Sequence, residues 1–462
     1  MPQADLYVRN GWLVSESRAF HGGVLVEGGR IAGLVEGNPE HAAVRTIDAA
    51  GLVVMPGLVD GHVHFSEPGR GHWEGFRTGS HAAAAGGITT IVEMPLNASP
   101  PTIDPVALAL KRSAAGQSIV DYGLWGGLVS DNRAHLAALQ AGGVAGFKAF
   151  MCASSTDFPR VDDIVMAGGM EQIAGFGALL AVHAEDEEMT FRLTADLRSA
   201  GRRDRRAWGQ ARPMAAELAA ITAAIGLAAR TGARLHVVHV SSAEGIDLIS
   251  AAKRRGLAIT AETCPHYLFF SQEDLVRIGP EAKCAPPLRS PEAVAALWDR
   301  VLAGDVDVIA SDHSPCLAEE KRAGDEDIFR AWGGISGLQS TLPALLTAGL
   351  PRGLKLTDLV RMVASNPARL FGFHPGKGAL AVGADADLTI VDIDARFTLG
   401  AEELHYRNRH SAYVGSAMRG RVRQTIGRGT ILFKDGQILV EQGGGRFLPG
   451  NGHAQADHAH AP

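Results

Sequence analysis

Alternation between strand-like and helix-like segments is the feature that most limits how this chain can fold. Between Pro56 and about Phe373, short apolar runs of strand character are separated by longer stretches rich in helix formers. One such stretch, Pro213 to Gly232, has a proline near its start and a glycine at its end, as helices often do. The eight strand candidates are GLVDGHVHF, GITTIVEMP, DYGLWGGLV, GFKAFM, ALLAVHAE, RLHVVHVSS, AITAETCPH and DVDVIASDHS.

Eight consecutive βα units favour a closed parallel barrel over an open doubly wound sheet. An open sheet usually carries a glycine-rich phosphate loop, and neither GxGxxG nor GxxxxGK[ST] stands at a strand-to-helix junction here. The flanking text instead reads as short antiparallel strands, with Gly28-Gly29 as a hairpin signal. We therefore predict an α/β protein: a (β/α)8 TIM-like barrel over 57–375, a small β-sandwich formed from both chain termini, 1–56 and 376–442, and a disordered tail over 443–462.

Composition argues against several classes of function. A formal charge of -6 gives no reason to expect nucleic acid or an anionic membrane as partner. The one basic run, Arg202 to Arg206, is interpreted as a solvated loop. No basic-then-apolar signal opens the chain, and its apolar runs are too short to span a membrane. The spacing of Cys152, Cys264, Cys284 and Cys316 fits neither a disulfide framework nor a CxxC site, which is typical of a reducing compartment. Together these features lead us to expect a soluble, cytoplasmic protein.

The first strand candidate carries a possible metal half-site. His62 and His64 stand two positions apart, so on a strand both imidazoles project from the same face. Zinc and its neighbours among the divalent ions readily take neutral imidazole nitrogen. A single HxH is weak evidence, because histidine also alternates with valine in ordinary strands, and the interpretation depends on the rest of the chain.

Further residues with ligand chemistry follow at the ends of other strands. In a barrel, residues at the C-terminal ends of the strands converge on one face. Lys148 belongs to the fourth strand, and His183, His239 and Asp312 end the fifth, sixth and eighth. Each histidine could be a core imidazole bonded to backbone, and Asp312 could cap the next helix. The coincidence of all six residues on one rim favours a metal centre.

Lys148 requires a separate argument, because a divalent cation repels an ammonium group and burial penalises its charge. If the amine has reacted with carbon dioxide, the resulting N6-carboxylysine is an anionic ligand with two oxygens that could bridge two metals. Two such ions can share a water-derived hydroxide available at neutral pH, while one also polarises a carbonyl oxygen. Asp312 could then carry a proton to the leaving nitrogen, which predicts hydrolysis of an amide. The alternative is an ordinary lysine bonded to a neighbouring carboxylate.

With these residues in place, nearly the whole chain resembles the cyclic-amidohydrolase branch of the amidohydrolase superfamily, which includes dihydroorotases, hydantoinases or dihydropyrimidinases, and allantoinases. The runs most similar to allantoinases are HVHFSEPGRGHWEGFRTGSHAAAAGGITTIVEMPLNASPPT, ETCPHYL, KCAPPLR, SDHSPC and WGGISGLQ. Dihydroorotases tend toward an arginine after HVH, an MPNT motif and alanine-proline-histidine after the catalytic aspartate. This chain has Phe65-Ser66, Met94 to Asn97, and Ser314 to Cys316 at those places.

The resemblance implies two divalent ions per chain, zinc or else cobalt or manganese, with carbon dioxide held as a lysine carbamate. It implies that His62 and His64 bind the more buried ion, Lys148 bridges, His183 and His239 bind the second ion, and Asp312 is both ligand and catalytic proton shuttle. It also implies that Cys284 and Ser314 contact the substrate, allantoin or a related cyclic ureide, and that the protein is a homotetramer. A small apolar rim residue is the alternative for Cys284.

Two competing functions remain open from the sequence. A hydantoinase, a dihydropyrimidinase or a dihydroorotase shares the metal ligands, and Ala149 and Met151-Cys152 depart from the usual allantoinase text, which bears on fine specificity. A non-catalytic scaffold of the same fold is the other alternative. All six ligand positions are present, which argues against the scaffold.

Overall fold

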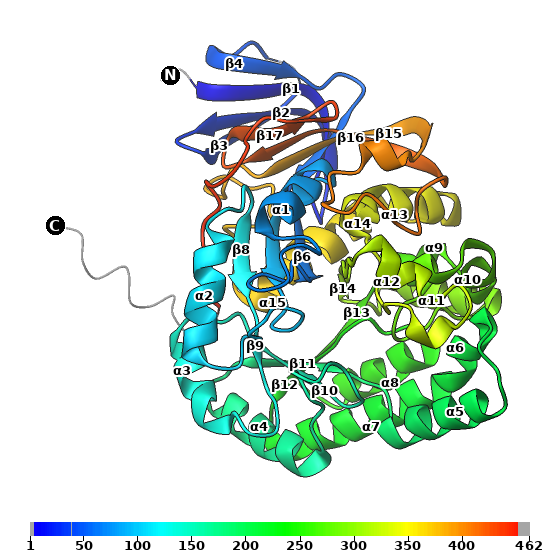
Figure 1. The fold of residues 1–462 in the computed structure, drawn as a ribbon. Helices are drawn as coiled ribbons and strands as arrows, with labels where there is room; N and C mark the ends of the chain where they lie inside the picture. Colours follow the sequence, from blue (N-terminus) through cyan, green and yellow to red (C-terminus); the bar gives the residue numbers. More distant parts are fainter. Residues whose placement is uncertain (1–3, 38, 451–462) are drawn as a thin grey trace.

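A parallel barrel forms the body of the computed structural model, which describes residues 4–37 and 39–450 (Figure 1). Its strands are buried on both faces, as expected for a sheet enclosed by helices. All eight predicted strands are confirmed, and the third is divided into β8 and β9 around Trp125. The barrel strands are β6 (Leu58–Val63), β7 (Ile88–Glu93), β8 (Asp121–Leu124), β9 (Gly126–Gly127), β10 (Phe147–Phe150), β11 (Leu179–His183), β12 (Arg234–Val237), β13 (Ile259–Thr263) and β14 (Val308–Ile309).

Parallel pairing continues around the ring in sequence order. Strands β6, β7 and β8 form one sheet, and β9 to β14 form the other. Since β8 and β9 belong to one stretch of chain, the two sheets join there. They meet again where Val63 bridges His313 in parallel and the backbone N–H of His64 donates to the carbonyl of His313 at 2.8 Å. The barrel therefore closes beside the predicted metal ligands.

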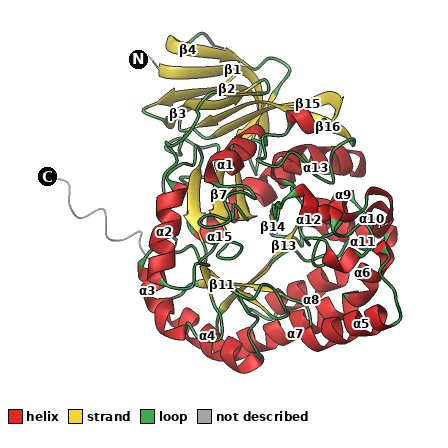
Figure 2. Ribbon diagram, viewed as in Figure 1, coloured by secondary structure: helices red, strands yellow, loops and turns green. Residues whose placement is uncertain are grey.

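Helices surround the barrel, as Figure 2 shows in red. The predicted helix after Pro213 is confirmed as α7, which ends at Gly232 in the left-handed conformation with φ of 71°. Contrary to the expectation that no apolar run is long enough to span a membrane, Arg205–Thr231 contains an 18-residue window that is long and apolar enough. In the structure α7 buries one face of this window within the protein. The helices are α1 (Phe76–Ala85), α2 (Pro105–Ala115), α3 (Leu136–Ala141), α4 (Asp163–Gly175), α5 (Glu187–Ser199), α6 (Arg205–Ala211), α7 (Met214–Thr231), α8 (Ala243–Arg254), α9 (Pro265–Phe269), α10 (Gln272–Ile278), α11 (Pro291–Ala303), α12 (Ala318–Arg322), α13 (Thr341–Gly349), α14 (Leu356–Val360) and α15 (Asn366–Phe371).

Strands from both ends of the chain build a second layer beside the barrel, at the top of Figure 1. The predicted hairpin at Gly28-Gly29 is confirmed between β2 and β3. The expectation of a purely antiparallel N-terminal unit is wrong. Both β4 and β5 pair with β1 in parallel, because the chain crosses over the sheet before it enters each of them in the same direction as β1. Antiparallel pairing of β15 with β5 joins the two termini. The strands are β1 (Ala4–Val14), β2 (Ala19–Glu27), β3 (Arg30–Glu36), β4 (Ala43–Asp48), β5 (Val53–Pro56), β15 (Leu388–Thr398), β16 (Ala417–Gly427), β17 (Thr430–Lys434) and β18 (Gln437–Ile438).

A buried charge cluster fastens this terminal sheet to the barrel. The Nζ atom of Lys377 contacts Asp121 at the start of β8, and it lies 2.9 Å from Asp385 and 2.8 Å from Asp387, which precede β15. The lysine side chain is 3% exposed. Because each carboxylate also approaches the same ammonium, the cluster offsets the cost of burying these charges.

The segment after β18 differs in part from the predicted disordered tail. Phe447 bridges Tyr122 of β8, and the backbone N–H of Leu448 donates to the carbonyl of Tyr122 at 2.8 Å. Gly450 donates to the carbonyl of Gly143 at 3.2 Å. Residues 443–450 therefore lie along the barrel, because apolar side chains within this polar text find contacts there. Residues 451–462 of the predicted tail lie outside the described part of the chain.

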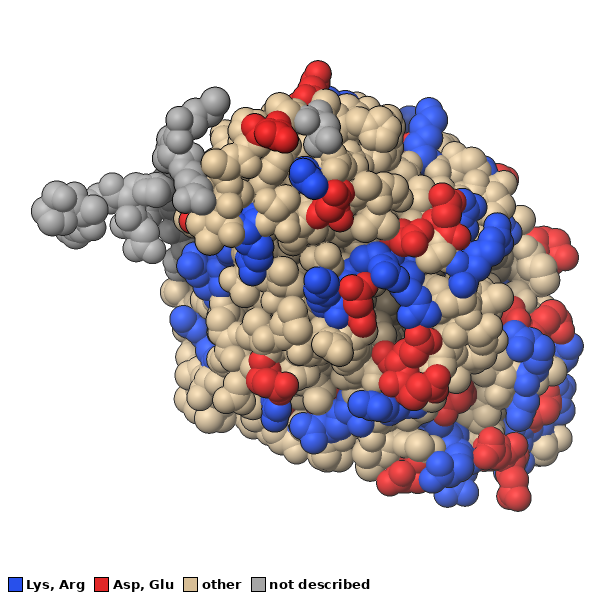
Figure 3. Space-filling model, turned by 90° about the horizontal axis from the view of Figure 1, so that it is seen from above, with Lys and Arg blue, Asp and Glu red and all other residues tan. Residues whose placement is uncertain are grey.

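Charged side chains of both signs are interspersed on the face seen in Figure 3. The arginine run that the sequence marked as a solvated loop follows the same pattern. Arg202 pairs with Asp204 at 2.7 Å, and Arg206 pairs with Glu273 at 2.7 Å. The expectation of a loop holds only for the first part of the run, because Arg205 and Arg206 begin α6. The ion pairs of Arg202 and Arg206 with neighbouring carboxylates agree with an ordinary solvated surface.

Candidate metal centre

The six residues singled out in the sequence lie at the C-terminal end of the barrel. His62 belongs to β6, and His64 follows directly after it. Lys148 lies in β10, His183 ends β11, and His239 and Asp312 stand just beyond β12 and β14. All six are buried, with Asp312 the most exposed at 8%. Parallel strands end at the same rim, so residues far apart in sequence meet there.

His62, His64 and Asp312 form the tighter group. The Nε2 atoms of His62 and His64 lie 3.2 Å and 3.4 Å from Oδ1 of Asp312. One ligand atom from each residue falls within 4.8 Å of the others, which is close enough to hold a single ion. Two imidazoles and a carboxylate are suitable ligands for zinc and related divalent ions.

His183 and His239 form an adjoining pair. Their ring centroids are 4.6 Å apart, and the ring of His239 lies 5.4 Å from that of His62. His239 and Asp312 have φ angles of 42° and 44°, in the left-handed region that side chains with a Cβ rarely adopt. Such backbone strain persists where surrounding structure imposes it, and it is concentrated at functional sites.

Lys148 is buried, and among the described residues its ammonium faces the Phe150 ring at 5.2 Å from the centroid but pairs with no carboxylate. Its side-chain nitrogen makes no hydrogen bond within the described part of the chain. Burial lowers the pKa of Lys148 to about 8, although the carboxylates of Glu262 and Asp312 act in the opposite direction. The Nδ1 atoms of His64 and His239 also lack partners among the described residues. Buried polar atoms are normally satisfied, so this cluster fits residues that bind a further group.

The protonation states of the rim residues suit metal binding. Burial lowers the pKa of His64 to about 4, with His62 and Lys148 acting in the same direction. Burial also holds the pKa of His239 well below its usual value. For Asp312 burial raises the pKa, but His62 and His64 outweigh it and the net shift is downward. Neutral imidazoles and an ionised carboxylate, the forms that bind metal, therefore prevail near neutral pH.

Glu262 of β13 supports the first group, and the sequence analysis missed it. Its Oε1 atom lies 2.7 Å from Nδ1 of His62, and its Oε2 atom lies 3.2 Å from Nε2 of His236. A carboxylate behind a ligating histidine fixes the tautomer and orientation of the ring. The signal in the sequence was a glutamate within an otherwise uncharged strand, AITAET, which must be satisfied once buried.

A second missed carboxylate, Glu185, lies behind His183. Its Oε2 atom is 2.7 Å from Nε2 of His183, and Arg212 donates through Nε to its Oε1 atom at 3.0 Å. Burial raises the pKa of Glu185, but Arg212 and His183 outweigh it and bring the pKa to about 2. Arg212 thus keeps this carboxylate ionised. Cys152, His183 and Glu185 could also hold an ion, and this group shares His183 with the site already described.

A cavity of about 240 Å³ opens above the rim. Ser314, predicted to contact substrate, lines it. The Cys284 side chain is buried behind the cavity wall, and the neighbouring Ala285 lines the cavity instead. The backbone carbonyl of Cys284 accepts a hydrogen bond from the Trp208 indole at 2.7 Å. Their contacts with substrate remain predictions. Other lining residues are Asn97, Phe150, Trp208, Arg212, Lys283 and Trp332.

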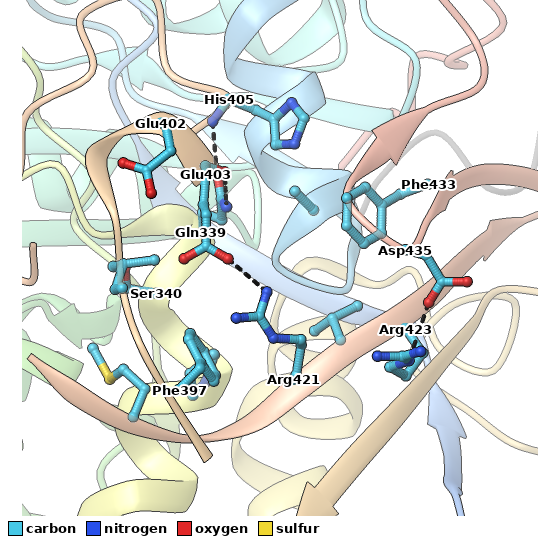
Figure 4. A pocket seen from close by; sticks show the side chains of 16 residues that line it. Gln339, Ser340, Phe397, Glu402, Glu403, His405, Arg421, Arg423, Phe433 and Asp435 are labelled. Atoms are coloured by element: carbon cyan, nitrogen blue, oxygen red, sulfur yellow. Dashed lines mark hydrogen bonds and ion pairs between the residues drawn. The ribbon is translucent and has the colours of Figure 1, made fainter. Parts of the chain in front are cut away.

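A larger cavity of about 420 Å³ lies where the terminal sheet meets the barrel (Figure 4). Four of its charged side chains pair with one another: Arg421 with Glu403 at 2.6 Å, and Arg423 with Asp435 at 3.0 Å. None of the six rim residues lines it. The smaller cavity, which four histidines and Asp312 line, is therefore the one equipped for chemistry.

Comparison with known proteins agrees with this assignment. Residues 53–432 match the model of the amidohydrolase family. The chain is 50% identical over 451 residues to an allantoinase of Rubrobacter xylanophilus, covering 97% of this chain and 98% of that protein. It is 46% identical to an allantoinase of Solibacter usitatus, covering 96% and 97%. An L-hydantoinase (dihydropyrimidinase) structure from Arthrobacter aurescens superposes with a TM-score of 0.94 at 38% identity, covering 97% of this chain and 100% of that one.

Proposed function

The chain belongs to the amidohydrolase family and, within it, to the allantoinases, and from this premise we propose that its rim residues hydrolyse allantoin to allantoate. The reaction adds water across one ring amide. The water oxygen bonds to the carbonyl carbon, the ring C–N bond breaks, and a proton goes to the released nitrogen. The observation that carries the proposal is the convergence of four histidines, one lysine and one aspartate on a single rim.

We assign the metal ligands as two adjoining groups. His62 and His64 would hold one ion, and His183 and His239, whose rings lie 4.6 Å apart, would hold the other. Asp312 completes the first group through its Oδ1 atom. Bound divalent ions, zinc or else cobalt or manganese, supply a water of lowered pKa and polarise the ring carbonyl.

The Lys148 amine fits a ligand that joins the two groups. Carbon dioxide would add to the neutral amine, forming an N–C bond and releasing one proton, which leaves an anionic carbamate. This change replaces a buried cation that lacks a partner with an anion between two cation sites. Support comes from the position of Lys148, whose charge acts on the pKa of His64, His183 and His239.

Asp312 moves the proton. As a carboxylate, it accepts a proton from the attacking water and then donates it to the leaving ring nitrogen. The lowered pKa of Asp312 keeps it ionised at the start of the cycle. The same carboxylate lies within 3.4 Å of two ligand histidines, so the proton is received beside the reacting centre.

A hydantoinase is the second candidate, because the Arthrobacter aurescens L-hydantoinase structure superposes so closely on this chain. Turnover on allantoin, an unsubstituted hydantoin and dihydroorotate separates the candidates. We expect kcat/KM to be highest for allantoin. A preference for hydantoin by tenfold or more would reassign the substrate while leaving the metal chemistry in place.

We also propose that the protein is cytoplasmic and assembles as a homotetramer. All four cysteines are free thiols and buried, as expected for a reducing compartment. The tetramer follows from family resemblance alone. Light scattering coupled to size-exclusion chromatography tests it, and a mass corresponding to one 48.5 kDa chain would contradict it.

A further inference from the structure

Lys283 is a cation in the catalytic cavity to which the hydrolytic steps give no role. It follows the short 3-10 helix Pro280–Ala282 and lines the same cavity as Asp312 and Ser314. Its residue exposure is 2%. Burying a lysine without an opposite charge costs free energy, so such a group calls for an explanation.

The donor count of Lys283 leaves one N–H available. Its Nζ atom donates to the carbonyl of Ala331 at 2.6 Å and, less closely, to that of Phe329 at 3.4 Å. An ammonium has three donors, and this one has no carboxylate within ion-pair distance among the described residues. The acidic group that acts on its pKa is Asp327, which pairs with Arg203 instead. Arg212, the other cation that lines the cavity, is already engaged with Glu185. Lys283 is therefore the cation with capacity for a substrate oxygen.

An aromatic surface accompanies this donor. The Nζ atom of Lys283 lies 4.1 Å from the centroid of the Trp208 ring, which also lines the cavity. The indole is fixed because its Nε1 donates to the carbonyl of Cys284 at 2.7 Å. A fixed aromatic ring beside a hydrogen-bond donor suits a flat group that carries a carbonyl oxygen.

Lys321 of α12 holds this end of the cavity in place. Its Nζ atom lies 3.1 Å from the carbonyls of both Pro280 and Trp332 and 3.3 Å from that of Lys283, and it contacts the carbonyl of Gly334 at 2.5 Å. One buried ammonium thus ties the loop that carries Lys283 to the loop that carries Trp332. Lys283 is consequently presented to the cavity by a preorganised frame.

We propose that Lys283 and Trp208 form a specificity subsite that binds the ureido substituent of the ring, with Lys283 donating to the ureido carbonyl. This inference rests on the proposed hydrolysis of allantoin. Lys283 lines the cavity but belongs to none of the groups that could hold a metal among the described residues, which agrees with a role in binding substrate rather than in the hydrolytic step. A ring without the ureido group gains nothing from this subsite.

The variant Lys283→Met tests the subsite, because methionine keeps an apolar stem and removes the donors. We expect kcat/KM for allantoin to fall roughly 10–100-fold, the range for losing one hydrogen bond from a charged donor. For unsubstituted hydantoin, kcat/KM or the inhibition constant against allantoin should change less than about threefold. Lys434→Met, on the exposed side of β17, is the matched control and should change neither value. Equal losses on both compounds would assign Lys283 to loop structure and overturn the proposal.

The wild-type enzyme offers a second test that does not depend on the variant folding. Burial, with Lys321 and Arg212 nearby, lowers the pKa of Lys283 to about 7, while Asp327 acts in the opposite direction. The preference for allantoin over hydantoin should therefore fall as pH rises from about 6 to 9.5, because a neutral amine is a weaker donor. Ionisations at the metal centre affect both compounds and cancel in the ratio. A ratio that stays flat over this range overturns the subsite.

Failure of the subsite differs from failure of the proposed function. If the wild type does not hydrolyse allantoin at all, the function is wrong. If the wild type hydrolyses allantoin and Lys283→Met loses kcat/KM equally for allantoin and hydantoin, the proposed function stands and the proposed subsite is wrong.

Discussion

Two buried lysines at opposite ends of the barrel have opposite surroundings. Lys377, beside the terminal sheet, contacts Asp121, Asp385 and Asp387, and despite the opposing effect of burial these carboxylates raise its pKa. Lys148, at the rim, has no hydrogen-bond partner among the described residues, and burial lowers its pKa to about 8. The first lysine is neutralised within the protein, whereas the second has no carboxylate paired with it among the described residues, which is the observation behind the proposed carbamate.

The same contrast extends beyond the two lysines. At the rim, Nδ1 atoms of His64 and His239 also lack partners among the described residues. At the terminal sheet, Asp121 forms ion pairs with Lys377 and Arg428 and accepts a hydrogen bond from the backbone N–H of Arg446. Buried polar groups that satisfy one another contribute to folding, and buried polar groups that do not are the ones expected to bind a ligand or metal.

The largest effect is expected from Lys148→Ala. If Lys148 carries the proposed bridging carbamate, its loss should reduce metal content below two ions per chain and turnover to background. Short carboxylic acids added to the medium should partly restore both, because they can occupy the space of the carbamate. Metal analysis and turnover measure the outcome.

Lys148→Arg is the matched control for that experiment. Its bulky cation fills the space that the acid needs, so no rescue is expected. Identical behaviour of the two variants would return Lys148 to the role of an ordinary structural lysine and remove the contrast with Lys377.

A smaller effect is expected from Asp312→Asn, which keeps the size and one coordinating oxygen but cannot accept a proton. Turnover per bound metal pair should fall about 10²–10⁴-fold while metal content changes little. The wild-type rate should rise with pH through an ionisation shared by Asp312 and the attacking water, and the variant should lose that limb. Turnover within a few-fold of wild type at full metal content would show that another group carries the proton.

Lys377→Met probes the other end of the barrel. Removing the cation leaves Asp387 and Asp121 buried and Asp385 partly buried, with Arg428 still paired to Asp121. The free energy of unfolding should therefore fall by about 3–5 kcal/mol, measured by denaturant titration. Metal content and turnover of the folded variant should stay near wild type. A variant that lost metal without losing stability would contradict the division between the two ends.

The pH dependence of this stabilisation has a definite direction. The folded-state pKa of Lys377 is raised above its ordinary value of 10.5. Its contribution is therefore fully present below pH 10.5 and is lost as pH rises through the folded pKa. Between about pH 7 and 9, the stability difference between Lys377→Met and wild type should stay constant.

The smallest effect is expected from Glu262→Gln. The amide oxygen of glutamine can still accept from Nδ1 of His62, but it is uncharged and therefore holds the ring in its tautomer more weakly than the carboxylate at 2.7 Å. Metal affinity should fall about 10–100-fold, with turnover recovering at high metal concentration. Competition with a chelator of known affinity measures it, and unchanged affinity would leave Glu262 with a purely structural role.

Much of the fold could be predicted from the sequence because barrel strands are short, apolar and regularly spaced. All eight strands and the helix after Pro213 lie where the pattern placed them. Strand pairing in the terminal sheet was harder to predict, because alternation of apolar and polar residues marks β4 and β5 as strands but does not show that they run parallel to β1. The contacts of Phe447 were missed because two apolar residues in polar text give little signal.

The residues predicted as ligands lie together at one rim, as the sequence indicated, and their binding of metal stays a prediction. The residues that support them were not predicted. His62, His64 and Asp312 could be found because strand ends converge in a barrel. Glu262, Glu185 and Lys283 were missed because each acts through a neighbour that only the three-dimensional arrangement reveals. For Cys284, the sequence could not separate a lining side chain from one buried behind the wall.

The most direct test of the account is turnover of allantoin as a function of bound metal. Protein stripped by dialysis against a chelator is titrated with zinc, cobalt or manganese, and metal content is measured alongside the formation of allantoate. The account predicts no activity without metal and full activity at two ions per chain. Full activity in a verified metal-free preparation would contradict it.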